Sequence, residues 1–166
     1  LEHRSTPRGF LELFSGSGEL TKAFTHIGMN TFSPHDVVFS RSMNLLQKHI
    51  QDTVIRFLES GHVWYVHLGT PCCVWSRARH NITHQARAED KEHRGTAFAL
   101  FSAHVAWLAS RLGFYWSIEN PAPSRLWESP PIKQLRCLPV ARLIHLTHCA
   151  FGAGHRKATT LLTNMI

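Results

Sequence analysis

The chain has 166 residues, of which 43% are hydrophobic, and its 18 Lys and Arg against 11 Asp and Glu give a formal net charge of +7. This length suits one compact domain, 1–166, with a substantial core of its own. No apolar run approaches the roughly 18 residues of a membrane span, and the positive charge favours polyanionic partners such as nucleic acid over a membrane.

Hydrophobic spacing divides the first half of the chain into alternating strands and helices. A short strand over 9–14 runs into the glycine turn Ser15–Gly18, and apolar residues at helical spacing follow it. The elements predicted after this turn are a helix over 19–27, a short strand over 31–33, a helix over 43–58 and a strand over 62–68.

The second half opens with a basic, polar stretch, 76–94, in which we expect a mobile loop. The elements predicted after it are a helix over 96–111, a buried strand over 114–118, an irregular proline-rich segment around 119–131, and two strands over 142–149 and 159–163. Alternating strands and helices predict an α/β fold with a mainly parallel sheet flanked by helices on both faces, and a ligand site at the carboxyl ends of the strands.

The turn after the first strand indicates a ligand that contains a ribose. Gly16 and Gly18 let the backbone approach a ligand closely, whereas Thr21 stands where a dinucleotide site would have its third glycine. Asp36 follows Gly16 by twenty residues, and a carboxylate there can accept both ribose hydroxyls. A turn or a helix cap is the alternative role for Asp36.

The sequence HLGTPCCVWSRARH, 67–80, places Cys72 and Cys73 directly after a strand. Basic neighbours such as Arg77 and Arg79 would lower the pKa of a thiol and make Cys72 a nucleophile, although a cysteine at a strand end is more often a small buried hydrophobe. His145, His148 and Cys149 do not have the spacing of a zinc site, so we expect no metal. The four cysteines of the chain are Cys72, Cys73, Cys137 and Cys149, and their spacing is not that of a disulfide framework. This favours a reducing intracellular compartment, which would be the nucleus in a eukaryote.

Glu119 and Asn120 close the buried strand in the sequence IENP, 118–121. A glutamate desolvated beside an apolar strand has a raised pKa and can deliver a proton near neutrality. Glu119 is therefore a candidate general acid, with loop bracing as the alternative. The polar clusters around Gly16, Asp36, Cys72 and Glu119 all follow strands, which predicts that they share one edge of the sheet.

These motifs, in this order, resemble the cytosine-5 DNA methyltransferase family, which uses S-adenosylmethionine. The stretches that carry the resemblance are LELFSGSGEL (11–20), GTPCCVWSRA (69–78), HRGTAF (93–98), IENP (118–121) and FGAGHRK (151–157). The resemblance implies a Rossmann-like methyltransferase fold and covers nearly the whole chain. Cys73 stands where the family has a glutamine, and Asn44 where an aspartate usually contacts the adenine of the cofactor.

The resemblance also implies a mechanism, in which Cys72 attacks C6 of a flipped-out cytosine while Glu119 protonates N3. The loop 76–94 would close over the base. The alternative is that this segment is a solvated surface loop without a role in catalysis. The site residues implied are Cys72, Glu119 and Arg156 or Lys157 for catalysis; Phe14, Ser15, Gly16, Gly18, Asp36 and Pro71 for the cofactor; and Ser76, Arg77, Arg79, Asn120 and Pro121 for the substrate.

Two departures from the family leave the function open. The family has a glutamine and two arginines where this chain has His155, Lys157 and Thr159, and it continues into a target-recognition domain past the position of Ile166. We therefore expect a partner protein or a further domain to supply target recognition. The alternatives to DNA methylation are methylation of RNA, an inactive methyltransferase-like module that binds nucleic acid or a partner enzyme, and, ranked last, a cysteine hydrolase.

Overall fold

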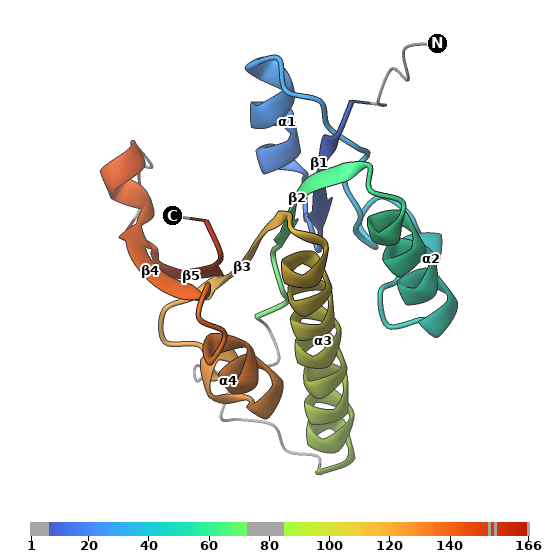
Figure 1. The fold of residues 1–166 in the computed structure, drawn as a ribbon. Coiled ribbons are helices and arrows are strands. Elements are labelled where there is room, and N and C mark those ends of the chain that lie inside the picture. Colours follow the sequence, from blue (N-terminus) through green and yellow to red (C-terminus); the bar gives the residue numbers. More distant parts are fainter. Residues whose placement is uncertain (1–6, 73–84, 153, 155, 166) are drawn as a thin grey trace.

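The computed structural model describes residues 7–72, 85–152, 154 and 156–165, with the backbone alone for 85–91. The helices and strands in chain order are β1 (Gly9–Leu13), α1 (Glu19–His26), α2 (Lys48–Glu59), β2 (Val63–Leu68), α3 (Gln85–Leu112), β3 (Tyr115–Pro121), α4 (Pro130–Arg136), β4 (Arg142–Thr147) and β5 (Ala158–Thr163). Short 3₁₀ helices lie at Arg41–Met43, Arg125–Glu128 and His148–Phe151. Figure 1 shows these elements along the chain.

The five strands form one sheet in the order β1-β2-β3-β5-β4. The pairs β1–β2 and β2–β3 are parallel, whereas β5 runs antiparallel to both β3 and β4. The predicted α/β fold is confirmed, but the sheet is mixed because the last two strands form a hairpin. The carboxyl ends of β1 to β4 and the start of β5 therefore meet at one edge, which we name the rim.

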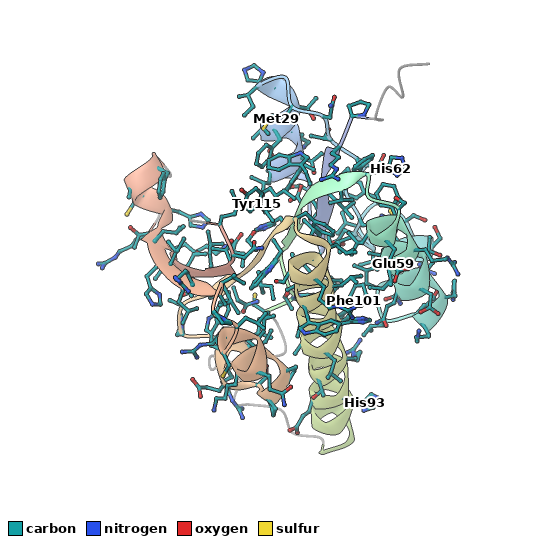
Figure 2. All side chains as sticks on the ribbon, in the orientation of Figure 1. Met29, Glu59, His62, His93, Phe101 and Tyr115 are labelled. Atoms are coloured by element: carbon teal, nitrogen blue, oxygen red, sulfur yellow. The ribbon has the colours of Figure 1, made fainter. Side chains whose placement is uncertain are left out.

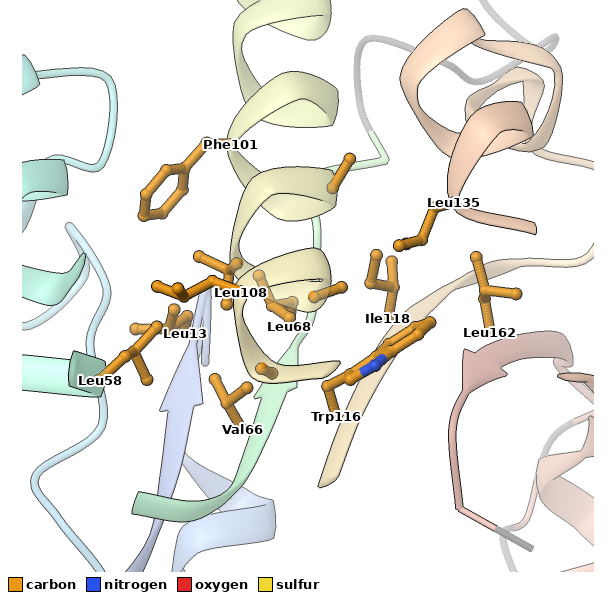
Figure 3. Close-up of a cluster of buried hydrophobic side chains, with 14 of the residues drawn as sticks. Leu13, Leu58, Val66, Leu68, Phe101, Leu108, Trp116, Ile118, Leu135 and Leu162 are labelled. Carbon is orange, nitrogen blue, oxygen red and sulfur yellow. The ribbon is translucent and has the colours of Figure 1, made fainter. Parts of the chain in front are cut away.

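One face of the sheet carries the hydrophobic core. Successive side chains of each strand point to opposite faces of the sheet. On one face, Leu13, Val66 and Trp116 join the hydrophobic cluster that α2, α3 and α4 cover. Figure 3 shows Leu58 of α2, Leu108 of α3 and Leu135 of α4 converging on this face. Burying each of these aliphatic side chains contributes roughly 1.5–3 kcal/mol, which makes this face the rigid support of the rim.

The opposite face is polar toward the rim. Phe10 and Glu12 of β1 point to this side, where Phe10 stacks on Phe24 of α1 at a ring distance of 4.4 Å. The carboxylate of Glu12 accepts hydrogen bonds from the backbone nitrogen and the hydroxyl of Thr21. Because α1 has no side-chain cap of its own at Gly18, Glu12 satisfies a free N–H of its first turn.

The largest difference from the expected elements is at the start of α3. Residues 85–94, expected to belong to a loop, form the first ten residues of a 28-residue helix. Ala, Glu, Lys and Arg dominate this stretch and favour a helix, and the absence of an apolar stripe does not require irregular backbone. At about 1.5 Å per residue, α3 extends well past the six-residue strand β2, and His93 lies on this extension in Figure 2.

Several smaller boundaries also differ. The strand expected over 31–33 contributes a single isolated bridge to β1, from Thr31, and the helix expected from residue 43 begins at Lys48. Pro130 starts α4 inside the segment expected to be irregular, because proline suits the first turn of a helix. In the described part of the chain, we find no helix with both the length and the apolar character that crossing a bilayer requires.

Candidate functional site

The glycine turn after β1 holds the backbone at the rim in a conformation that few residues adopt. Phe14, Gly16 and Gly18 have φ angles of 53°, 55° and 70°. For Phe14 this left-handed conformation is uncommon, and its ring is fixed edge-on against Phe98 of α3 at a centroid distance of 5.3 Å. Ser15 follows, and its Oγ is buried without a hydrogen-bond partner among the described residues. The turn thus presents an unused polar atom at the rim.

Asp36 fastens this turn to the next loop. Its Oδ2 accepts a hydrogen bond from the backbone nitrogen of Gly16 at 2.9 Å, and its Oδ1 accepts one from Val38 at 2.9 Å. The carboxylate is half-buried. The alternative turn role of Asp36 is therefore real, and it places the carboxylate beside the glycine turn.

A cavity of about 280 Å³ opens beside Asp36 and Phe14. Its wall is mostly apolar and is contributed by the glycine turn, by the residues that precede α2, by the end of β2 and by α3. The lining residues are Phe14, Asp36, Val37, Met43, Asn44, Leu45, Leu46, Pro71, Arg94 and Phe98. Three residues of the predicted cofactor set, Phe14, Asp36 and Pro71, thus line one cavity, and Asn44 lines it as well. The apolar wall was not predicted.

The end of β2 delivers Pro71 to this cavity and Cys72 to the surface next to it. Gly69 allows the approach, because a Cβ at this position would lie 2.7 Å from the carbonyl oxygen of Phe14. Its N–H donates to Leu13 and continues the β1–β2 pairing past the strands. Cys72 carries a free, exposed thiol. Cys73 and the predicted substrate residues Ser76, Arg77 and Arg79 lie outside the described residues.

The IENP motif belongs to β3 itself. Glu119, Asn120 and Pro121, expected to follow the strand, pair with Leu161, Thr160 and Thr159 of β5. Pairing with β5 holds these residues extended up to the rim, whereas the pairing of β3 with β2 ends at Ile118. Asn120 is buried and donates from Nδ2 to the carbonyl oxygen of Thr70 at 2.6 Å, which joins the strand end of Glu119 to that of Cys72.

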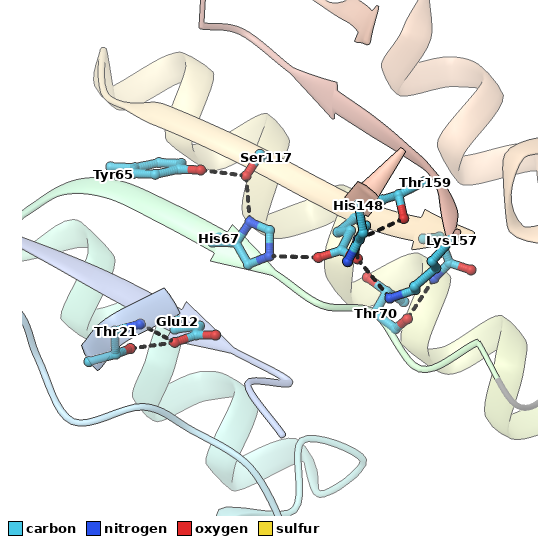
Figure 4. A network of polar contacts seen from close by, with 11 residues as sticks. Glu12, Thr21, Tyr65, His67, Thr70, Ser117, His148, Lys157 and Thr159 are labelled. Atoms are coloured by element: carbon cyan, nitrogen blue, oxygen red, sulfur yellow. Dashed lines mark hydrogen bonds and ion pairs between the residues drawn. The ribbon is translucent and has the colours of Figure 1, made fainter. Parts of the chain in front are cut away.

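Basic side chains surround the carboxylate of Glu119. Lys157 Nζ lies 3.3 Å from Oε1, His148 Nε2 lies 4.0 Å from the same oxygen, and His67 Nε2 lies 3.7 Å from Oε2. Of the two predicted basic residues, Lys157 is the one that reaches this carboxylate, and Arg156 beside it is exposed. Figure 4 shows this cluster at the end of the polar face.

These neighbours lower the pKa of Glu119, whereas the sequence predicted a raised pKa. The contact with His67 and the charge of Lys157 outweigh desolvation and lower the pKa of Glu119 to about 2. The expectation of a raised pKa is wrong because the strand end is apolar on its core face only, whereas Glu119 lies on the polar face and its side chain is 29% exposed. In the free protein this carboxyl group is ionised near neutrality.

A row of buried polar groups continues from Glu119 along the polar face. His67 Nδ1 lies 2.7 Å from Ser117 Oγ, which lies 2.7 Å from the hydroxyl of Tyr65. Register explains the row, because Tyr65 and His67 of β2 pair with Tyr115 and Ser117 of β3. Sequence reasoning missed all three, although a histidine and a serine at paired strand positions are the available signal.

The sequence matches no protein-family model and no curated protein. Its fold, by contrast, is similar to the crystal structure of the Dnmt2 methyltransferase of S. pombe, with a TM-score of 0.56 and 16% sequence identity. The similarity covers 96% of this chain and 51% of the S. pombe protein, so this chain spans about half of the other's length. The α/β architecture around the rim is therefore a methyltransferase-like, Rossmann-like fold.

Proposed function

We propose that this chain transfers a methyl group from S-adenosylmethionine to C5 of cytosine in DNA through a covalent adduct of Cys72. The observation that carries the proposal is that Pro71 lines the cavity while Cys72, the next residue, is exposed beside it. A molecule in the cavity would therefore end next to the thiol. The methyltransferase-like fold supports this reading.

The cavity suits an adenosine-containing ligand. Asp36 offers the carboxylate that a ribose requires, and Val37, Leu45 and Phe98 offer an apolar wall for adenine. Ser15 Oγ lies buried in the adjoining glycine turn without a partner among the described residues, and Ser15 itself does not line the cavity. S-adenosylmethionine supplies an electrophilic methyl group when it is bound.

The protein groups at the rim provide the remaining chemistry. The thiolate of Cys72 would form a bond to C6, and N3 of cytosine would take up a proton from the Glu119 side, so that C5 gains electron density. C5 would then bond to the methyl group as the bond from that methyl to the sulfonium sulfur breaks, with S-adenosylhomocysteine as the leaving group. Transfer of the C5 proton to solvent water and cleavage of the bond from C6 to sulfur would then release methylated cytosine and restore the thiolate. N3 returns its proton in the same step.

The test is an oligonucleotide that contains 5-fluorocytosine, in which the missing C5 proton prevents elimination. We expect a covalent adduct that requires S-adenosylmethionine and disappears in Cys72→Ser. Cys137→Ser is the matched control, since Cys137 is also a free, exposed cysteine and lies at the end of α4. Absence of the adduct in the wild type would contradict the proposal, as would an adduct that survives in Cys72→Ser.

One observation favours a second candidate, an inactive module that binds nucleic acid or a partner enzyme. Glu119 is ionised in the free protein, whereas the acid role requires a proton at this position. Binding of S-adenosylmethionine without any adduct would support this candidate. Parallel assays with DNA and RNA oligonucleotides of the same sequence separate the two substrate classes, because only RNA carries the 2′-hydroxyl.

A further inference from the structure

The buried imidazole of His67 stands directly behind Glu119 on the polar face. His67 is 6% exposed, and its Nε2 faces Oε2 of Glu119 at 3.7 Å. The other face of the carboxylate is more open, with Lys157 at Oε1. A proton on His67 Nε2 therefore points toward Glu119.

The opposite nitrogen of the ring fixes this orientation. His67 Nδ1 lies 2.7 Å from Ser117 Oγ, which is 2% exposed. Tyr65 holds the serine from the other side at 2.7 Å and is itself buried. Anchoring of one ring nitrogen sets the direction in which the other donates. These three side chains, shown together in Figure 4, position the imidazole.

We propose that His67 is a positioning residue that stores the proton which Glu119 passes to N3 of cytosine. The inference rests on the proposed function and deepens it. In this arrangement His67 and Glu119 share one proton, which sits on the imidazole at rest. Glu119 then acts as an acid although its carboxyl group is ionised before the base enters.

The proton moves in two transfers that balance. When the sulfur of Cys72 bonds to C6, N3 becomes basic and takes a proton from Glu119, and the bond between Nε2 of His67 and its proton breaks to replace it. The imidazolium becomes neutral imidazole, and the carboxylate is restored. On elimination N3 gives the proton back along the same route, so no outside acid is consumed.

The low pKa of Glu119 fits this proton storage. Contact with His67 is the largest cause of the lowered pKa of Glu119, so the carboxylate form is favoured where His67 Nε2 faces it. The charged or titratable groups that face the pair are Glu12 of β1, which pairs in register with His67; Tyr65 of β2; and Lys157 and His148 beside Glu119.

The experiment measures single-turnover methyl transfer by the whole chain as a function of pH. The rate of the wild type should fall over the range in which histidines lose their proton, which gives the profile a descending limb. His67→Gln keeps an N–H toward Glu119 but cannot store a proton, so the descending limb should vanish and the rate should fall about 100-fold. His145→Gln is the matched control. Nδ1 of His145 contacts the hydroxyl of a threonine on β5, as Nδ1 of His67 contacts the hydroxyl of Ser117, but His145 is exposed.

A double-mutant cycle with Glu119→Gln separates this role from a structural one. If His67 acts through Glu119, adding His67→Gln to Glu119→Gln should slow transfer no further. Additive losses, or a descending limb that persists in His67→Gln, would overturn the inference while methyl transfer by the wild type still stood. A wild type without any transfer would overturn both proposals.

Ser117→Ala gives a second variant that leaves the histidine in place. Loss of the partner at Nδ1 makes the imidazolium less favourable, so the descending limb should move to lower pH. Circular dichroism and thermal unfolding establish that each variant is folded. An unmoved limb in folded Ser117→Ala would count against the stored proton.

Discussion

Asn120 Nδ2 donates a hydrogen bond to the carbonyl oxygen of Thr70 over 2.6 Å, and both residues are buried. The bond spans fifty residues of sequence and joins the end of β3 to the end of β2. Thr70 is also held from α3, since its hydroxyl lies 2.8 Å from Ser102 Oγ. Buried contacts thus help to set the position of Cys72 relative to Glu119.

Replacing Asn120 with alanine should loosen this connection. The carbonyl of Thr70 would lose a buried partner, at a cost of about 1–3 kcal/mol in the free energy of unfolding. Adduct formation with 5-fluorocytosine should fall as well, because the strand end that carries Cys72 is less constrained. Asn30→Ala at an exposed position is the control. Urea unfolding and the adduct yield measure the two effects, and equal values for the two variants would contradict the coupling.

Replacing Asp36 with alanine should weaken binding of S-adenosylmethionine by at least tenfold, or about 1.4 kcal/mol. The variant loses the two hydrogen bonds that Asp36 accepts from Gly16 and Val38, together with the carboxylate that we propose as the partner of the ribose. Isothermal titration calorimetry measures the affinity. Asp52→Ala removes an aspartate paired with Lys48 on the surface of α2 and should bind as the wild type does. Unchanged affinity in Asp36→Ala would place the cofactor elsewhere.

Gly69→Ala should disturb the cavity from a different side. The new Cβ would lie 2.7 Å from the carbonyl oxygen of Phe14, so the end of β2 and the glycine turn must separate. Overpacking of this kind costs about 1–3 kcal/mol, and the affinity for S-adenosylmethionine should fall with it. At Gly154 a Cβ meets open space, which makes Gly154→Ala the matched control. Thermal unfolding and calorimetry together would show whether the close approach at Gly69 matters.

The residues that lie at the rim could largely be predicted from the sequence, because local sequence patterns mark where each strand ends. Glycines, prolines and β-branched runs bound the strands, and parallel strands carry their ends to one edge, which brings Asp36, Pro71 and Glu119 to the rim. The start of α3 was missed because a solvated helix and a polar loop have the same lack of an apolar stripe.

The acidity of Glu119 could not be read from its neighbours in sequence. Its partners come from three other parts of the chain, namely His67 on β2, His148 after β4 and Lys157 before β5. Only the register of β3 against β2 and β5 decides which face Glu119 occupies. A one-residue shift would turn its side chain into the hydrophobic core, where desolvation would raise the pKa as expected.

Glu119 should also link the stability of the fold to pH. Its pKa in the folded state, about 2, lies below the ordinary value of 4.5, so its stabilising contribution is complete above pH 4.5 and is lost as the pH falls toward 2. With discounting for solvent screening, this contribution is roughly 2 kcal/mol. Glu119→Gln should therefore unfold at lower urea concentration than the wild type at pH 7, and the gap should close between pH 4.5 and 2. Glu128→Gln, which removes an exposed partner of Lys133, should show little gap at any pH. A gap for Glu119→Gln that stays constant from pH 7 to 2 would mean that the ring of basic groups does not hold this carboxylate ionised.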